Sequence, residues 1–245
     1  MTEDLKRLSP RVDRFIVGSD AVAEMLRRFG VSSPVDRVYE FSPRGSSTEI
    51  DGSSVRRELN IPDDAFVVGA CGTVESRKGT DLFISVARKL LKDHSYFRFV
   101  WIARKDVESD PMYNDAIESI RKHGLTERVM IVKSEGSPEN YLATLDVFVL
   151  SSREDPFPLV CLEAANLGKP IVCFADAGGM PEFVGDDAGA VVPFEDIDAM
   201  ERSIETFYHD PEKRKEAGRT AQRKAHTDFS TETACRSIFQ IITSI

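Results

Sequence analysis

Two carboxylates in one segment are the residues whose types and spacing most suggest chemistry. Asp155 and Glu163 lie eight positions apart in SREDPFPLVCLEAANLGKPIV, residues 152–172. Pro156 and Pro158 stiffen the turn, and proline is well tolerated at the first position of a helix. We therefore expect Asp155 just ahead of a helix and Glu163 about one and a half turns into it.

Glu163 stands among apolar neighbours, with Leu162 before it and Ala164 after it. An unpaired buried charge is costly, so a carboxylate in that setting needs a partner. Either a cation of the protein or the hydroxyl groups of a ligand would serve. The alternative, a glutamate at a helix edge close to solvent, is equally compatible with the pattern.

The loop GTVESRKGT, residues 72–80, follows an apolar run and precedes a helical pattern. Backbone N–H groups at that helix start, beside Arg77 and Lys78, suit a phosphate. The alternative is a turn that needs Gly72 and Gly79 and carries two solvated cations. The loop fits neither G-x-G-x-x-G nor G-x-x-x-x-G-K-[ST], so dinucleotide and P-loop assignments lack support.

Three weaker features have plainer interpretations. In DAGGMPEFVG, residues 176–185, two adjacent glycines permit a close backbone approach, either to a ligand or within a tight turn. Asp196 and Asp198 form D-x-D, a pattern that holds a metal in some sugar-transferring enzymes. We favour the interpretation that these aspartates cap and begin the following helix. The four histidines are scattered, and none pairs with Ser or Cys in a nucleophile arrangement.

The composition limits the classes of function. The chain has 245 residues, of which 41% are hydrophobic and 30% charged, as in soluble globular proteins. A net charge of −9 argues against nucleic-acid or acidic-membrane binding by the whole surface. No apolar run approaches the ~20 residues of a membrane span, and the first residues lack the apolar core of a signal peptide. Because the four cysteines form no C-x-x-C pair, we expect reduced thiols and a cytoplasmic protein.

The elements that must position these loops alternate between strands and helices. Expected strands are 14–19, 36–41, 66–71, 97–103, 128–132, 146–150, 170–174 and 189–194. Expected helices are 20–30, a short one ending at 59, 80–93, 111–124, 137–145, one from about 158, and three after 196 that break near Pro211 and Ser230. This alternation predicts an α/β fold with a doubly wound, mostly parallel, Rossmann-like sheet. Ligands of such sheets bind beyond the carboxyl ends of the strands, here the loops at 71–79, 132–137, 151–158 and 175–182.

Several of these loops together resemble a known family. SREDPFPLVCLEAANLGKPIV is similar to the E-x(7)-E segment of retaining glycosyltransferases of family 4, with Asp155 and Glu163 on the two acidic positions. GTVESRKGTDLFI resembles the family's G-R-L-x-x-x-K-G-x-D-x-x-I loop, with Lys78 on its lysine, and GGMPEFV resembles its G-G-x-P-E turn. The resemblance runs from about Asp13 to the C-terminus. It implies the C-terminal, donor-binding half of the two-domain B-type glycosyltransferase fold.

The resemblance also implies roles for individual residues. Lys78 would bind the donor's diphosphate, Glu163 would accept hydrogen bonds from the nucleotide ribose, and Asp155 would lie beside the donor sugar. Lys78 and Asp155 are therefore the candidate catalytic residues. The loop near residues 133–136 would meet the base. The backbone N–H groups of Phe157 and Leu159 would face the sugar or the phosphates. The expected donor-binding set is Gly72, Thr73, Arg77, Lys78, Arg153, Asp155, Phe157, Leu159 and Glu163.

This sequence departs from the family pattern at several positions. Thr73 stands where many members have an arginine, so Arg77 or Arg153 must supply that charge if it is supplied at all. Asp155 is shorter than the usual glutamate. Pro156 and Pro158 replace glycines and cannot donate N–H bonds. We expect the family's acceptor-binding domain to be absent from this sequence, with only its last strand and helix in residues 13–30.

We therefore expect residues 1–41 to be the end of an acceptor domain with a linker strand, 42–54 a linker or loop, and 55–245 the donor-binding domain with C-terminal helices. The expected function is hexosyl transfer from a nucleotide-diphosphate sugar, such as a UDP- or GDP-sugar, to a glycan or other hydroxyl acceptor. The family implies no cofactor and no metal, and any peripheral membrane association would run through the missing half. The alternatives are a non-catalytic nucleotide-sugar-binding module, a nucleotide-sugar epimerase and a phosphorylase.

Overall fold

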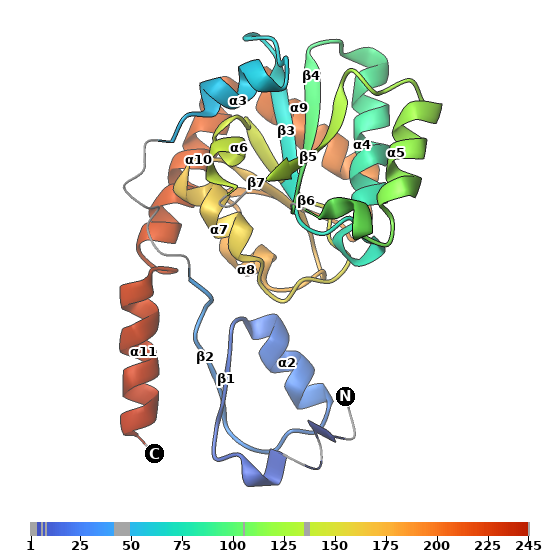
Figure 1. The fold of residues 1–245 in the computed structure, drawn as a ribbon. Helices are drawn as coiled ribbons and strands as arrows, with labels where there is room; N and C mark the ends of the chain where they lie inside the picture. The colour runs from blue at the N-terminus through green and yellow to red at the C-terminus, as the bar shows by residue number, and fades with distance from the viewer. Residues whose placement is uncertain are drawn as a thin grey trace.

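The computed structural model of this chain describes residues 4, 5, 7, 9–41, 50–104, 106–134 and 138–244. Its main body is built on one six-stranded sheet. The strands are β3 (Phe66–Cys71), β4 (Phe97–Arg104), β5 (Val129–Ser134), β6 (Val147–Leu150), β7 (Ile171–Phe174) and β8 (Gly189–Val192). Their order across the sheet is β5-β4-β3-β6-β7-β8, and every neighbouring pair is parallel (Figure 1). The expected doubly wound parallel sheet is confirmed.

The strand order places the switch point between β3 and β6. From β3 the chain winds outward through β4 to β5, and it then returns to the other side of β3 at β6. In such sheets ligands bind beyond the carboxyl ends of the strands, at this switch point. The loops that follow these strands are residues 72–79 and 151–158.

Two hydrophobic clusters, one on each face, hold the helices to the sheet. One cluster joins α4 (Thr80–Asp93), α5 (Tyr113–Lys122) and α9 (Ile197–His209) to Phe97, Phe99 and Trp101 of β4. The other joins α6 (Glu139–Ala143), α7 (Leu159–Asn166), α8 (Met180–Val184) and α10 (Pro211–His226) to the alternate residues Val100 and Ile102. Successive strand side chains point to opposite faces, so both faces of this sheet are buried.

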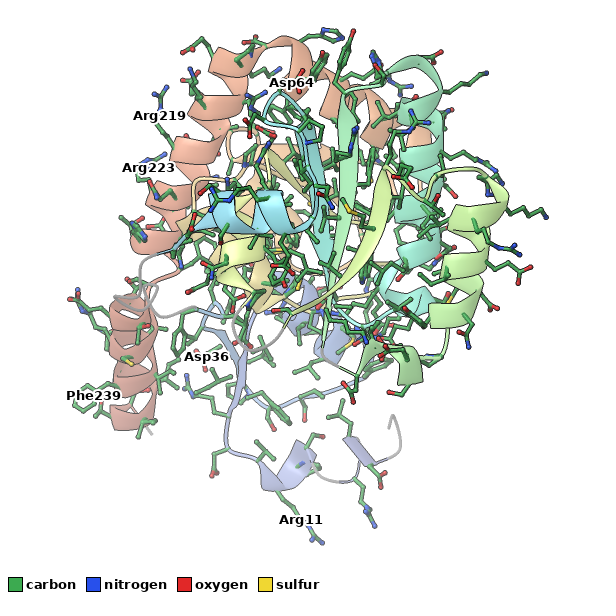
Figure 2. All side chains as sticks on the ribbon, turned by 45° about the horizontal axis from the view of Figure 1, so that its top comes forward. Arg11, Asp36, Asp64, Arg219, Arg223 and Phe239 are labelled. Carbon is green, nitrogen blue, oxygen red and sulfur yellow. The ribbon has the colours of Figure 1, made fainter. Side chains whose placement is uncertain are left out.

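A small unit precedes the main body. β1 (Phe15–Val17) pairs in parallel with β2 (Val35–Arg37), and α2 (Asp20–Arg28) connects them. In Figure 1 this unit lies below the main sheet, beside α11 (Thr231–Thr243) and the C-terminus. Phe239 on α11 is 67% exposed and projects from that helix (Figure 2). In the part of the chain described here, no helix is long and apolar enough to cross a membrane.

Some expected boundaries differ by a few residues from those observed. The expected linker 42–54 overlaps α3 (Gly52–Glu58), whose N-cap Asp51 accepts hydrogen bonds from the N–H groups of Ser53 and Ser54. Residues 42–49 lie outside the described residues, so the division at 41 and 54 stays a prediction. The three C-terminal helices are confirmed, with breaks at Asp210 and at residues 227–230.

Candidate functional site

The loops after β3 and β6 bring Lys78 and Asp155 together. The Lys78 ammonium donates a hydrogen bond to the Asp155 carboxylate, and 18% and 7% of these two side chains are exposed. Lys78 ends the 3-10 turn η2 (Ser76–Lys78), and Gly79 follows at φ 71°. A Cβ at Gly79 would lie 1.8 Å from the carbonyl oxygen of Ser151, so only glycine lets the two loops come this close.

The loop that carries Lys78 is held at several points along its length. The Trp101 indole N–H donates to the carbonyl of Gly72 at 2.9 Å, and the Asp110 carboxylate accepts from the N–H of Val74 at 2.7 Å. The Ser151 hydroxyl donates to the carbonyl of Gly79 at 2.9 Å. These bonds fix the backbone around Lys78 before any ligand arrives, which lowers the ordering cost of binding.

Arg153 ties the same loop to the rest of the site. Its guanidinium binds the Asp81 carboxylate at 2.8 and 2.7 Å, and its Nε donates to Glu195. It also donates to the carbonyl of Ser76 at 2.7 Å. The hydrogen bond from Arg153 holds the pKa of Asp81 below its ordinary value. Through these acceptors the Arg153 guanidinium connects α4, η2 and the loop after β8 by hydrogen bonds.

Arg77 and Thr73, also expected near the donor, lie on the same loop. The Arg77 guanidinium donates to the carboxylate of Glu75 at 2.9 Å and to the carbonyl of Glu154 at 3.1 Å, and 45% of the side chain is exposed. Thr73 is half-buried. The first residue of α4, Thr80, is 1% exposed, and within the described chain no hydrogen-bond partner reaches its hydroxyl. The N-cap of α4 is Gly79.

The Asp155 loop is braced by the glycine turn after β7. The Asp155 N–H donates to the carbonyl of Ala177 at 2.7 Å, and Gly179 N–H donates to the carbonyl of Pro156 at 2.9 Å. The ring of Phe157 is buried, while Leu159, the first residue of α7, is 45% exposed. Of the expected site residues on this loop, Phe157 is therefore part of the core, whereas Leu159 is open to solvent.

Glu163 lies on α7, half-buried, as the sequence suggested. Burial is the main cause that raises the pKa of its carboxyl, and the charge of Glu139 adds to the effect. Its charge also reaches Cys71 at the end of β3, whose thiol has a pKa raised to about 12, mainly by burial. Among the described residues no cation or N–H group donates to Glu163 in the hydrogen bonds of the structure.

The remaining candidate features either have partners within the protein or lie partly outside the described residues. The Asp196 carboxylate accepts from the N–H of Ala199 at 2.8 Å, which confirms it as the cap of α9, and Asp198 pairs with Lys89. No cluster of three or more His, Cys, Asp or Glu side chains that could hold a metal occurs in the described ranges. Lys133, at the loop expected to meet a base, pairs with Glu108. Residues 135 and 136 of that loop lie outside the described residues.

Most partners that hold the site are not indicated by any sequence pattern. Asp81, Glu195, Asp110 and Trp101 come from α4, the loop after β8, the loop after η3 (Val107–Ser109) and β4. Asp81 falls on the aspartate of the K-G-x-D pattern, but no spacing links the other three to residues 72–79 or 153. Only the observation that a buried arginine or aspartate needs a partner could have prompted a search for them.

Comparison with known proteins gives the family. Residues 52–224 match the family model described as glycosyl transferases group 1. Over 117 residues the chain is 35% identical to the O-antigen biosynthesis glycosyltransferase WclY of Escherichia coli, covering 48% of this chain and 31% of that protein. It is 24% identical to the lipopolysaccharide core biosynthesis glycosyltransferase LpsE of Rhizobium meliloti, covering 95% of this chain and 64% of LpsE.

Solved structures agree on the fold. The structure of Anabaena Alr3699/HepE in complex with UDP superposes with a TM-score of 0.86 at 21% identity, covering 100% of this chain and 68% of HepE. Sucrose-phosphate synthase from Thermosynechococcus elongatus gives a TM-score of 0.84 at 20% identity, covering 98% and 61%. The chain thus spans about one third to two thirds of the length of the relatives it matches.

Proposed function

Since this chain belongs to the glycosyl transferases group 1 family, we propose that it is the donor-binding part of a retaining hexosyltransferase that uses a nucleotide-diphosphate sugar. The observation that carries the proposal is the meeting of Lys78 and Asp155 at the switch point of the sheet, with Lys78 two positions before the first residue of α4. The similar protein HepE has been solved in complex with UDP and in complex with UDP-glucose, which supports a donor of this class.

Lys78 is the group we assign to the donor's diphosphate. The Asp155 carboxylate holds the Lys78 ammonium in place before a ligand binds. A diphosphate at the first turn of α4 would attract this ammonium and the backbone N–H groups of the helix start, and the Thr80 hydroxyl lies there without a partner among the described residues. The same charges stabilise the diphosphate as it becomes the leaving group.

Asp155 is the group we assign to the donor sugar. When the diphosphate takes over the Lys78 ammonium, the Asp155 carboxylate gains free lone pairs that sugar hydroxyls can fill. In a front-face reaction the bond from the anomeric carbon to the phosphate oxygen breaks, and the acceptor oxygen bonds to that carbon on the same side. The acceptor's proton moves to the departing phosphate oxygen, so the step needs no proton acceptor from this chain.

Glu163 is the group we assign to the ribose. A half-buried carboxylate that receives no hydrogen bond from the described residues has unused acceptor capacity, and two neighbouring hydroxyl groups of a ribose would fill it. We further propose that Gly72, Thr73, Phe157 and Leu159 line the donor, and that Arg77 contributes positive charge. Arg153, expected to touch the donor, acts through Ser76 and Asp81 by holding the Lys78 loop.

Calorimetry with UDP, GDP and their 2′,3′-dideoxy analogues tests these assignments. We expect the wild-type chain to bind UDP or GDP and to lose about tenfold in affinity when the ribose hydroxyls are removed. Glu163→Ala should lose a similar factor with the parent nucleotide and almost nothing more with the dideoxy analogue. Glu118→Ala, an exposed glutamate on α5, is the control. If Glu163→Ala loses the same factor of affinity for the parent nucleotide and for its dideoxy analogue, the ribose role is refuted. If the wild-type chain binds neither UDP nor GDP, the proposed function is refuted.

A non-catalytic nucleotide-sugar-binding module remains the second candidate, because the chain spans only part of its relatives. Both candidates bind the donor, and only one transfers its sugar. Loss of the sugar from the bound donor to an added glycan or to water, measured by release of the nucleoside diphosphate, would decide for the enzyme. The cytoplasmic location, the hydroxyl acceptor and the absence of a cofactor stay predictions of the same proposal.

A further inference from the structure

Three segments far apart in the chain meet at Gly178 and Gly179. A Cβ at Gly178 would lie 1.7 Å from the carbonyl oxygen of Asp155. A Cβ at Gly179 would lie 2.5 Å from the Cβ of Ser19 and 2.7 Å from the carbonyl oxygen of Pro156. The glycine pair is therefore explained by packing of the Asp155 loop and the start of α2 against the turn.

Glu182, four positions after Gly178, holds the start of α2. Its carboxylate accepts the N–H groups of Asp20 and Ala21, both at 2.9 Å. Ser19 is fully buried, accepts the N–H of Val22 at 3.2 Å, and donates its hydroxyl proton to the carbonyl of Pro156 at 3.3 Å. The first N–H groups of a helix have no partner within the helix, and an anion is favoured there.

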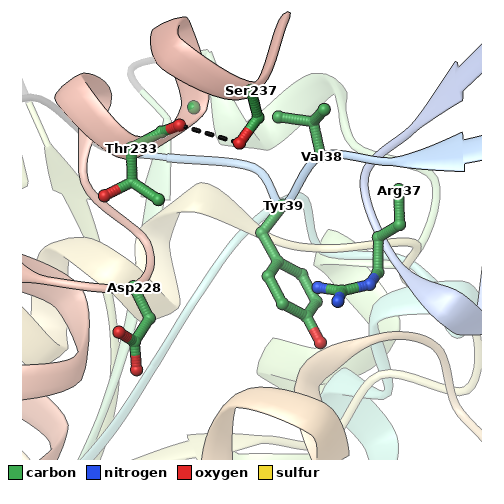
Figure 3. A pocket seen from close by; sticks show the side chains of 7 residues that line it. Arg37, Val38, Tyr39, Asp228, Thr233 and Ser237 are labelled. Carbon is green, nitrogen blue, oxygen red and sulfur yellow. Dashed lines mark hydrogen bonds between the residues drawn. The ribbon is translucent and has the colours of Figure 1, made fainter. Parts of the chain in front are cut away.

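Tyr39, in the segment after β2, lies close enough to Glu182 for that carboxylate to affect its phenol. Burial raises the pKa of its phenol to about 12, and the charge of Glu182 and a side-chain hydrogen bond to it add to that effect. The Arg37 guanidinium lies 3.8 Å from the centre of the Tyr39 ring and pairs with Asp20 at 3.1 Å. Figure 3 shows the Tyr39 ring between Arg37 and α11, at a small pocket also lined by Asp228 and Thr233.

The ring of Tyr39 also reaches the Asp155 loop. Its centre lies 5.9 Å from that of Phe157 and 4.5 Å from that of Phe229. Phe157 and Phe229 stack at 5.7 Å, and Phe157 is two residues from Asp155. The Asp155 loop therefore has two links to the small N-terminal unit: the carbonyl of Pro156 bonded by Ser19, and the ring of Phe157 packed on Tyr39.

We propose that Glu182 and Tyr39 are positioning residues, which lock the unit formed by β1, α2 and β2 onto the Asp155 loop and so fix Asp155 relative to Lys78. This inference rests on the proposed function. Without the Glu182 carboxylate, the start of α2 loses its acceptor, Ser19 is no longer held against Pro156, and the Asp155 loop loses one of its two links to the small N-terminal unit. The consequence falls on Asp155, because the Lys78 loop keeps its own bonds to Trp101, Asp110 and Arg153.

Two measurements on the full chain test the proposal with Glu182→Gln, Tyr39→Leu and the control Glu212→Ala, an exposed glutamate in the first turn of α10. Tyr39→Leu removes the ring that packs on Phe157. In hydrogen exchange, we expect the amides of Asp20, Ala21 and Gly179 to exchange about tenfold faster in both test variants. The control should leave these amides unchanged.

In calorimetry, we expect the affinity of the two test variants for UDP or GDP to change by less than about twofold. The ratio of nucleotide-sugar affinity to diphosphate affinity, the sugar gain, should fall about tenfold. The probes are UDP-glucose and GDP-mannose, each compared with its diphosphate. An unchanged sugar gain despite faster exchange would reduce the lock to a structural contact and overturn the proposal. If wild type binds no nucleotide, the proposed function fails, and unchanged exchange at Gly179 would then overturn the lock separately.

Discussion

The Lys78 ammonium and the Asp155 carboxylate form an ion pair across 77 positions of the chain, between the loops that follow β3 and β6. The pair places a cation and an acid at the single point of the sheet where the strand order reverses. Both side chains are largely buried, so each charge depends on the other as its counter-charge. A ligand that takes Lys78 away from Asp155 must therefore also give the Asp155 carboxylate a new partner.

Lys78→Ala is expected to lower both stability and nucleotide affinity. The Asp155 side chain, 7% exposed, would lose its counter-charge, and breaking a buried pair in this way costs about 3–5 kcal/mol. Lys78→Ala combined with Asp155→Asn removes the stranded charge, so we expect it to regain most of the stability and none of the diphosphate affinity. Chemical denaturation and calorimetry with UDP or GDP measure the two effects. A double variant that binds like wild type would exclude Lys78 from diphosphate binding.

Glu163→Gln is expected to stabilise the protein at neutral pH. Burial raises the folded-state pKa of Glu163 above its unfolded value. Between these two pKa values the folded protein binds the proton more tightly than the unfolded chain does. Stability contributed by this group is therefore present at low pH and is lost as pH rises through the raised pKa. Thermal melts at pH 4 and pH 7 should show a higher midpoint for the variant at pH 7 only. A variant less stable than wild type at pH 7 would indicate a stabilising partner for the carboxylate.

Gly79→Ala is expected to cost far more than Gly124→Ala. The two glycines have similar backbone angles, φ 71° and φ 66°, so both substitutions bear the same left-handed strain of about 1–2 kcal/mol. Only at Gly79 does the new Cβ meet another chain segment, 1.8 Å from the carbonyl oxygen of Ser151, whereas Gly124 has open space. Urea denaturation of both variants separates the contact from the strain. Equal losses would mean that the Lys78 loop can move away from Ser151 without cost.

Arg153→Lys is expected to flatten the acid sensitivity of the protein. The hydrogen bonds from Arg153 lower the folded-state pKa of Asp81, so the stability from this pair is present above the unfolded pKa and is lost as pH falls through the folded one. Lysine cannot bind the carboxylate with two parallel N–H groups. Melts between pH 6 and pH 3 should show a shallower decline for the variant. Arg219→Lys, exposed on α10 (Figure 2), should retain the wild-type slope.

Tyr39 is expected to titrate near pH 12. Absorbance titration of wild type minus Tyr39→Phe isolates its phenol from the other four tyrosines. Glu182→Gln should lower that midpoint, because the neighbouring negative charge and hydrogen bond favour the neutral phenol. A midpoint near 10 in wild type would place Tyr39 in solvent and away from Glu182.

The sequence by itself determined the elements and the loops that matter. Apolar periodicity separated strands from helices along the main body, and caps such as Asp196 and Ser230 marked helix starts because their partners lie three residues away. The strand–helix alternation also predicted the parallel sheet, and with it the loops that carry Lys78 and Asp155. These signals are local, since each depends on residues within one or two turns of the chain.

Only the tertiary structure decided what those loops touch. Arg153, expected at the donor, binds Asp81 and Glu195 from two other elements. Glu182, the last residue of the G-G-x-P-E pattern, holds the start of α2 across 162 positions. Such pairs form when the strand register and the loop paths bring their backbones within hydrogen-bond reach. No spacing within the chain encodes that approach, so the partners of a charged residue emerge only once the sheet has placed both loops.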